Sequence, residues 1–235
     1  MNSILVIARK EIKELFGNRY TLILGAAFAL FFSIIRSLAI IKEMESSIVA
    51  TSLDSTLFYL SASIGFFMAY ISASQIFLRE KVNGVIETLL CAPISLRQIW
   101  FGKVLGITGF AYMFSLFTVV IILLVSGILS GLFILPGAIV IAHVLLVVPT
   151  FIAALTGLIG FAQFLLGMRE NRILNFVLFM PAFIALYGIG LSASNSFKIR
   201  WEYIAILFIS SMLLLAITTY LTKHLSKERI VATIA

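Results

Sequence analysis

The side chains whose types and spacing could do chemistry lie in one polar segment, residues 79–103, between two of the longest hydrophobic stretches. Helical spacing gives this segment an apolar face that holds Val82, Val85, Ile86, Leu89 and Leu90. The opposite face is polar or small and holds Glu80, Gly84, Glu87, Thr88 and Cys91. This pattern predicts a short amphipathic helix at the membrane surface, suited to receiving force or a signal from outside the bilayer.

Two signals end this helix and begin the next one. Pro93 ends it, because the residue before a proline resists helical geometry. Ser95 and Gln98 then form a capping box, which predicts the start of a second helix that enters the membrane. A charged loop with a solvated face is the alternative interpretation of the same residues.

The segment resembles the intracellular segment of ABC-2 type transporter permeases. The matching residues, in order, are Glu80, Lys81, Gly84, Glu87, Thr88, Leu89, Leu90, Pro93, Ile94, Ser95, Gly102 and Lys103. In that family the segment forms the coupling helix, which rests on a separate ATP-hydrolysing subunit, so residues 79–98 are expected to be a cytoplasmic coupling segment. The residues that the resemblance assigns to coupling with the ATPase are Glu80, Lys81, Gly84, Glu87, Thr88, Leu89, Leu90 and Pro93.

The resemblance also has implications for partners and cofactors. Two six-span chains, identical or paralogous, would pair around a central path and rest on two ATP-binding cassette subunits. ATP and Mg²⁺ would bind to those subunits, and this chain would hold no cofactor and no catalytic residue of its own. Closure of the ATPases would move the coupling helices and tilt the spans on either side of them. The family further implies export rather than import.

The composition is that of a chain buried in lipid. With 62% hydrophobic and 11% charged residues it differs from soluble domains, in which about half of the residues are apolar and about a quarter charged. The net charge of +7 is spread between hydrophobic runs rather than gathered in a patch, which argues against nucleic-acid binding. The single cysteine, Cys91, excludes an intrachain disulfide, and no cluster of Cys and His predicts a metal site.

The hydrophobic pattern predicts an all-α integral membrane protein with one domain, residues 1–235, and six spans. The predicted spans are residues 20–41, 56–78, two within 99–168, 173–191 and 201–221. The run 99–168 is assigned two spans because basic residues flank both of its ends, and basic residues favour the cytoplasmic side. The turn between these two is expected at 126–136, and Pro149 is expected to kink the later one. Both termini then lie in the cytoplasm, with the chain in the plasma membrane.

Residues 1–18 predict an amphipathic helix that lies in the membrane interface. Its predicted apolar face holds Ile4, Leu5, Ala8, Ile12 and Leu15. Its predicted polar face holds the basic residues Arg9, Lys10 and Lys13, together with Glu14. A signal peptide fits less well, because the apolar run that follows is too long for a signal core and has no small-residue cleavage site.

Small residues recur every four positions in the first two spans, a pattern that lets helices approach closely. The first span carries Gly25, Ala29 and Ser33, and the second carries Ser61, Gly65, Ala69 and Ala73. These stripes could serve packing within one chain, which is the commoner use, or contact between two chains. The resemblance places the first and fifth spans at the dimer interface, which would involve Gly25.

Side chains that move ions or catalyse reactions are missing from the middle of the predicted spans. No Asp or Glu falls there, and no zinc, nucleophile or phosphate-binding motif occurs in the chain. His143 stands alone in the fourth span, which predicts a hydrogen-bonded packing residue. An ATP-independent channel or secondary carrier is the alternative function. It predicts polar residues along a path at mid-membrane, and these are sparse.

Overall fold

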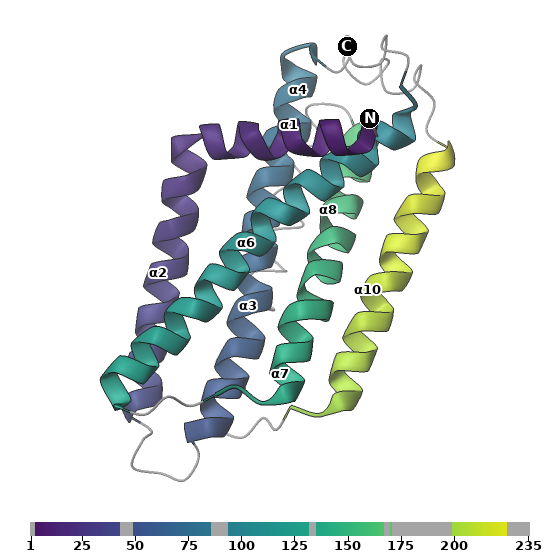
Figure 1. The fold of residues 1–235 in the computed structure, drawn as a ribbon. Helices are drawn as coiled ribbons and strands as arrows, with labels where there is room; N and C mark the ends of the chain where they lie inside the picture. Colours follow the sequence, from purple (N-terminus) through teal and green to yellow (C-terminus); the bar gives the residue numbers. More distant parts are fainter. Residues whose placement is uncertain are drawn as a thin grey trace.

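The computed structural model describes residues 3–42, 49–85, 94–131, 135–166, 170 and 199–224, and all regular structure among them is helical. Long helices stand side by side, and α1 lies crosswise over one end of them (Figure 1). The long elements are α1 (Ser3–Gly17), α2 (Arg19–Lys42), α3 (Val49–Ala73), α6 (Leu96–Ser130), α8 (Val148–Leu165) and α10 (Trp201–Leu221). The short elements are η1 (Ser74–Leu78), α4 (Arg79–Val82), α7 (Ala138–Ala142), η2 (His143–Val147) and η4 (Thr222–His224).

Within this part of the chain, five helical stretches are long and apolar enough to cross a membrane. They are Arg19–Ile40, Ala50–Lys81, Leu96–Leu129, Ala138–Leu165 and Trp201–Leu221. These stretches correspond to the predicted spans one, two, three, four and six, and the regular structure of the described residues is helical, as predicted. The predicted fifth span, 173–191, lies outside the described residues. Figure 1 shows that α8 ends at the same end of the bundle as α1, whereas α10 begins at the opposite end.

The small-residue stripes pack inside the chain. A Cβ atom on Gly25 would lie 2.6 Å from Cε of Met68 on α3 and 2.8 Å from Cε1 of Phe114 on α6. A Cβ on Gly65 would lie 2.6 Å from Cδ1 of Ile152. The remaining members are also buried: Ala29, Ser33, Ser61, Ala69 and Ala73. Both stripes therefore serve packing within one chain, the first of the two uses that the sequence allowed.

The helix that leads into the polar segment differs from the prediction at its end. The prediction ended the second span at residue 78 and continued one apolar stripe from Val82 through Leu90. In the structure, α3 runs through the π-helical turn η1 into α4, which ends at Val82, and a turn at Asn83 and Gly84 follows. Gly84 has φ of 67°, a left-handed conformation that glycine adopts without strain, so the predicted stripe is interrupted there. Residues 86–93 lie outside the described part.

The start of the next helix agrees with the prediction. Ser95 caps α6, because its Oγ accepts a hydrogen bond from the backbone N–H of Gln98 at 3.2 Å. Gln98 Oε1 in turn accepts one from the backbone N–H of Ser95 at 3.1 Å, which completes the capping box. These two hydrogen bonds fix the residue at which the chain passes from the polar segment into α6.

Two helical stretches long and apolar enough to cross a membrane, Leu96–Leu129 and Ala138–Leu165, lie where the two spans within 99–168 were predicted, and the first ends within the predicted turn. Helix α6 ends at Ser130, and Gly131 follows with φ of 67°. The next span begins at α7, where Asp54 Oδ1 accepts a hydrogen bond from the backbone N–H of Gly137 at 2.9 Å. The kink expected at Pro149 stays a prediction, but the π-helical turn η2 lies directly before α8, whose second residue is Pro149. A proline has no N–H for the helical ladder, and a π-helical turn absorbs that defect.

Candidate functional site: a buried ion-pair cluster at one end of the bundle

Two glycines of α6 seat α1 across the end of the bundle. A Cβ on Gly102 would lie 2.6 Å from Cβ of Ile7 and 3.0 Å from the backbone oxygen of Ile4. A Cβ on Gly106 would lie 2.9 Å from the backbone oxygen of Ala8. The absence of side chains at positions four apart lets the two helices approach closely. Gly102 belongs to the motif of the polar segment, whereas its pairing with Gly106 was not predicted from the sequence.

The buried face of α1 differs from the predicted apolar face. Leu5, predicted to be on it, is 64% exposed, while Ile7 is buried. Glu11 lies on the buried face and is fully enclosed, between α1 and α6. The predicted face was defined by apolar residues alone, so Glu11 was missed. A buried acidic residue can be predicted from sequence only if a basic partner for it is also identified.

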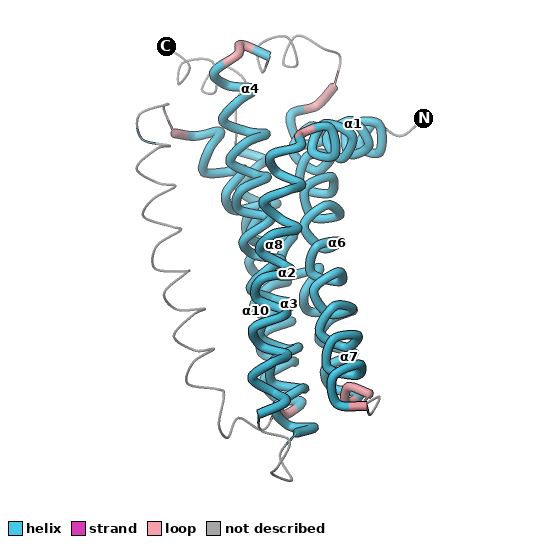
Figure 2. Tube along the Cα trace, turned by 90° about the vertical axis from the view of Figure 1, so that its left-hand side faces the viewer, coloured by secondary structure: helices cyan, strands magenta, loops and turns pink. Residues whose placement is uncertain are grey.

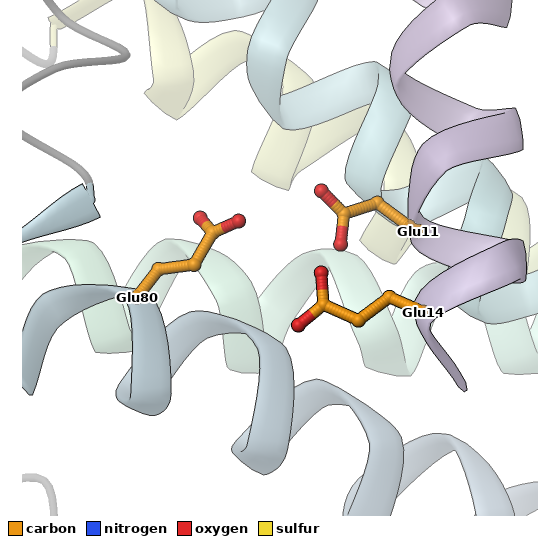
Figure 3. A group of neighbouring side chains, drawn as sticks. All are labelled: Glu11, Glu14 and Glu80. Carbon is orange, nitrogen blue, oxygen red and sulfur yellow. The ribbon is translucent and has the colours of Figure 1, made fainter. Parts of the chain in front are cut away.

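That cation is Lys103 of α6, and together they form the core of an ion-pair cluster. The cluster consists of Glu11, Glu80, Lys10 and Lys103. Lys103 Nζ lies 2.8 Å from Glu11 Oε1 and 2.6 Å from Glu80 Oε2. Lys10 Nζ lies 2.9 Å from Glu80 Oε1 and 3.3 Å from Glu11 Oε1. Figure 3 shows the carboxylates of Glu11 and Glu80 pointing toward each other, from α1 and from the helix that leads into the polar segment.

Burial makes the cluster energetically consequential. The side chain of Lys103 is 0% exposed, that of Glu11 1% and that of Glu80 6%. Removing a charge from water costs several kcal/mol, roughly, and only good pairing offsets this cost. Glu80 Oε2 meets Lys103 as a close charge contact rather than as a well-directed hydrogen bond, and Glu11 Oε2 has no hydrogen-bond partner. The ring of Phe77, 5.7 Å from Lys103 Nζ, gives this ammonium a further favourable contact.

Lys10 occupies the rim of the cluster and is about half exposed. Partial burial lowers its pKa, but Glu11 and Glu80 raise the pKa by more, so it lies above the ordinary 10.5. A raised folded-state pKa means that the stabilisation from Lys10 is fully present below pH 10.5. It is lost as the pH rises through the folded-state pKa.

Two further contacts connect the same end of the bundle. Gln75 Oε1, in the π-helical turn η1, accepts hydrogen bonds from Asn18 Nδ2 at 3.1 Å and Thr21 Oγ1 at 2.8 Å. This joins the corner between α1 and α2 to the helix that leads into the polar segment. Lys81 Nζ donates to the backbone oxygen of Leu166 at 2.5 Å, just past the C-terminus of α8. A cation at that position also complements the negative end of the helix dipole.

The predicted coupling residues therefore fall into three groups. Glu80 and Lys81 point into the bundle and bind α1, α6 and the end of α8. Gly84 forms the turn after α4, and a Cβ there would contact nothing within 4 Å. The other members lie outside the described residues: Glu87, Thr88, Leu89, Leu90 and Pro93. Of the predicted basic face of α1, Arg9 and Lys13 are exposed, and Lys10 belongs to the cluster.

The carboxylates of Glu11, Glu14 and Glu80 come within 4.8 Å of one another, which is close enough for a metal site. The ammonium groups of Lys10 and Lys103 lie among them, at 2.6 to 2.9 Å from Glu11 or Glu80. Glu14 adds a looser contact to Lys10 at 3.8 Å. The lysines thus supply the positive charge that these acids need, and the group acts as a set of ion pairs.

A second polar group lies between the long helices, apart from the ion-pair cluster, and is held by hydrogen bonds to backbone oxygens. His143 Nε2 lies 3.1 Å from the backbone oxygen of Phe58, and its ring packs on the Phe58 ring at 4.0 Å between centroids. Ser115 Oγ donates to the backbone oxygen of Ser61 at 2.7 Å, and Tyr112 Oη to that of Val144 at 3.1 Å. His143 is thus a hydrogen-bonded packing residue, as predicted.

Comparisons of the chain with protein-family models, with curated proteins and with solved structures find no match in any of the three. The motif in the polar segment and the geometry around it are therefore the basis for assigning a function.

Proposed function

We propose that this chain is the membrane-spanning permease subunit of an ATP-driven ABC transporter, an exporter of the plasma membrane. A separate subunit would bind and hydrolyse ATP, and residues 79–98 would be the coupling segment that rests on it. One observation carries this proposal. Glu80 and Lys103, which stand at the two ends of the motif, form a buried ion pair at 2.6 Å, and Glu11 of α1 joins them.

This ion pair gives the polar segment a mechanical connection to the bundle. The segment leaves from α4 and returns through α6, and the cluster fastens these two helices to each other and to α1. A partner that pushes on the segment would therefore move α3, α6 and α1 together rather than bend a loose loop. Packed, charge-paired elements move as units, because buried pairs resist separation. This behaviour is what a coupling segment requires.

The ends of the described helices support six spans with both termini in the cytoplasm. The turn after α4, the start of α6 and the end of α10 lie at the same end of the bundle as α1 (Figures 1 and 2). Between Leu165 and Trp201 the chain has to pass from one end of the bundle to the other. We assign this crossing to the predicted fifth span, 173–191.

A second copy or a paralogue of the chain would complete the transporter, and its contact surface is expected on the outside of α2. Because Gly25 packs inside the chain, the dimer interface cannot depend on the small-residue stripe. The other side of α2 carries large exposed apolar side chains, among them Ile23, Phe31 and Ile35. These side chains are available to a second chain or to lipid.

The test is transport and ATP hydrolysis in vesicles that contain the chain and the ATPase that copurifies with it. Glu87→Ala is expected to leave membrane insertion unchanged and to uncouple hydrolysis from transport, because truncating a desolvated interface charge can cost about 2–5 kcal/mol. Glu202→Ala is the matched control, since Glu202 is an exposed acid at the opposite end of the bundle. Normal transport by Glu87→Ala at matched abundance, or the lack of any copurifying ATPase, would contradict the proposal. Gly84→Trp would be a less specific variant than Glu87→Ala, because any side chain at φ of 67° strains the turn itself.

A further inference from the structure

The face of α1 that points away from the bundle carries only positive charge. Leu5, Arg9, Lys13 and Phe16 recur at spacings of four, four and three residues, so they form one stripe along the helix. All four are exposed. The acids of α1 lie elsewhere, since Glu11 is buried against Lys103 and Glu14 contacts Lys10. The stripe is therefore basic in its centre and apolar at both ends.

Arg9 and Lys13 are not used in the ion-pair cluster. Neither makes an ion pair with any residue that the structure describes. They lie one helical turn apart, a distance over which two cations can meet one or two neighbouring phosphate groups. Two basic side chains without an acidic partner among the described residues, with apolar neighbours on the same stripe, favour a surface that is both anionic and apolar.

The contacts of α1 with α6 fix its depth relative to the bilayer. Helix α6 has 35 residues, which is about 52 Å of helix, whereas the hydrocarbon core is about 30 Å thick. The end turns of α6 therefore lie in the headgroup layer. Helix α1 packs on Gly102 and Gly106, within the first eleven residues of α6, and it passes into α2 at Arg19, where another candidate span begins. Helix α1 thus lies level with the headgroups rather than beyond them.

We propose that the outward stripe of α1 binds anionic lipid headgroups, with Arg9 and Lys13 on the phosphates and Leu5 and Phe16 against the upper acyl chains. The charge of the stripe, its apolar ends and its depth all fit this occupant. The site does not depend on what the chain transports or on its energy source. It would hold α1 in the interface from outside, while Gly102, Gly106 and Lys103 hold it from inside.

The experiment uses the full chain in phosphatidylcholine vesicles with trace spin-labelled phosphatidylglycerol or spin-labelled phosphatidylcholine. The ratio of their association constants measures the preference for the anionic lipid. A basic residue near an anionic surface contributes about fivefold in affinity. The Arg9→Gln/Lys13→Gln variant is expected to lose most of this preference, and Arg9→Lys/Lys13→Arg to keep it. The melting temperature should not change, because both side chains are exposed.

The control is Arg97→Gln/Lys223→Gln, which removes the same charge from exposed residues at the same end of the bundle. It should retain the preference. An unchanged preference in Arg9→Gln/Lys13→Gln, or an equal loss in the control, would overturn the proposal. If Arg9→Gln/Lys13→Gln keeps the lipid preference but loses a protein partner in a pull-down, the stripe binds an acidic protein surface instead. This result would also overturn the proposal.

Discussion

The ion-pair cluster and the polar group around His143 are both buried in an otherwise apolar chain, yet they use different chemistry. The cluster at the end of the bundle is charged and joins α1 to α4 and α6, through pairs that are 70 and 92 positions apart in the sequence. The group around His143 contains no ion pair among the described residues, and its side chains donate to or contact backbone oxygens of neighbouring helices. The cluster thus buries charged side chains as ion pairs, whereas the group around His143 buries polar side chains through hydrogen bonds.

Depth explains this difference. A charge near the end of a span can be paired there, with water and headgroups close by, while a charge at the bilayer centre costs at least about 2.5–3.5 kcal/mol. Neutral hydrogen bonds are the form of polarity that the centre tolerates. We therefore expect the ion pairs at the end of the bundle to transmit movement between helices, and the hydrogen bonds deeper in the bundle to contribute to packing alone.

The largest expected effect comes from Lys103→Met, which removes the fully buried cation of the cluster. Glu11 and Glu80 would lose their closest partner, and an uncompensated buried charge costs about 3–5 kcal/mol. The free energy of unfolding in mixed micelles measures this loss. Lys10→Met is the matched control, because Lys10 contacts the same two carboxylates but is half exposed, and a solvent-screened pair contributes only about 0–1 kcal/mol.

Adding Glu11→Gln to Lys103→Met sharpens the same comparison. The double variant should lose less unfolding free energy than the sum of the losses in the two single variants, because it removes an acid together with its cation. Equal destabilisation by Lys103→Met and Lys10→Met would mean that water reaches the cluster in solution and that the two lysines are equivalent.

A smaller effect is expected from a side chain at the crossing of α1 and α6. In Gly106→Ala the new Cβ would lie 2.9 Å from the backbone oxygen of Ala8, so α1 must shift, and overpacking of this kind costs about 1–3 kcal/mol. In Gly109→Ala the nearest atom is Cδ1 of Ile12 at 3.7 Å, an ordinary contact. Both substitutions gain the same helix propensity, so their difference in unfolding free energy isolates the crossing. No difference between them would show that the close approach of α1 is not needed for stability.

Much of the fold follows from the sequence because membrane spans are set by local hydropathy. The bounds of α10, the capping box at Ser95 and the two spans before residue 168 were all predictable from residues within one or two turns of each other. The ion-pair cluster was not predictable in this way, because Glu11 and Lys103 are 92 positions apart and each has a plausible solvent-exposed role alone. The break at Gly84 was missed for a different reason. Its neighbours fit a helical stripe, and only the backbone conformation reveals the turn.

The smallest effect is expected in the polar group around His143, where Tyr112 completes the backbone hydrogen bonding of the π-helical turn η2. The backbone N–H of Val148 donates to the backbone oxygen of His143, and Pro149 has no N–H to donate to that of Val144. The backbone oxygen of Val144 therefore depends on the hydroxyl of Tyr112. Tyr112→Phe should cost about 0.6 kcal/mol, the average for hydrogen bonds between membrane helices. Tyr20→Phe is the control, because Tyr20 is 87% exposed. In a Pro149→Ala background the new N–H can reach the same oxygen, and Tyr112→Phe should then cost less. An equal cost in both backgrounds would mean that the proline is not what leaves Val144 in need of a donor.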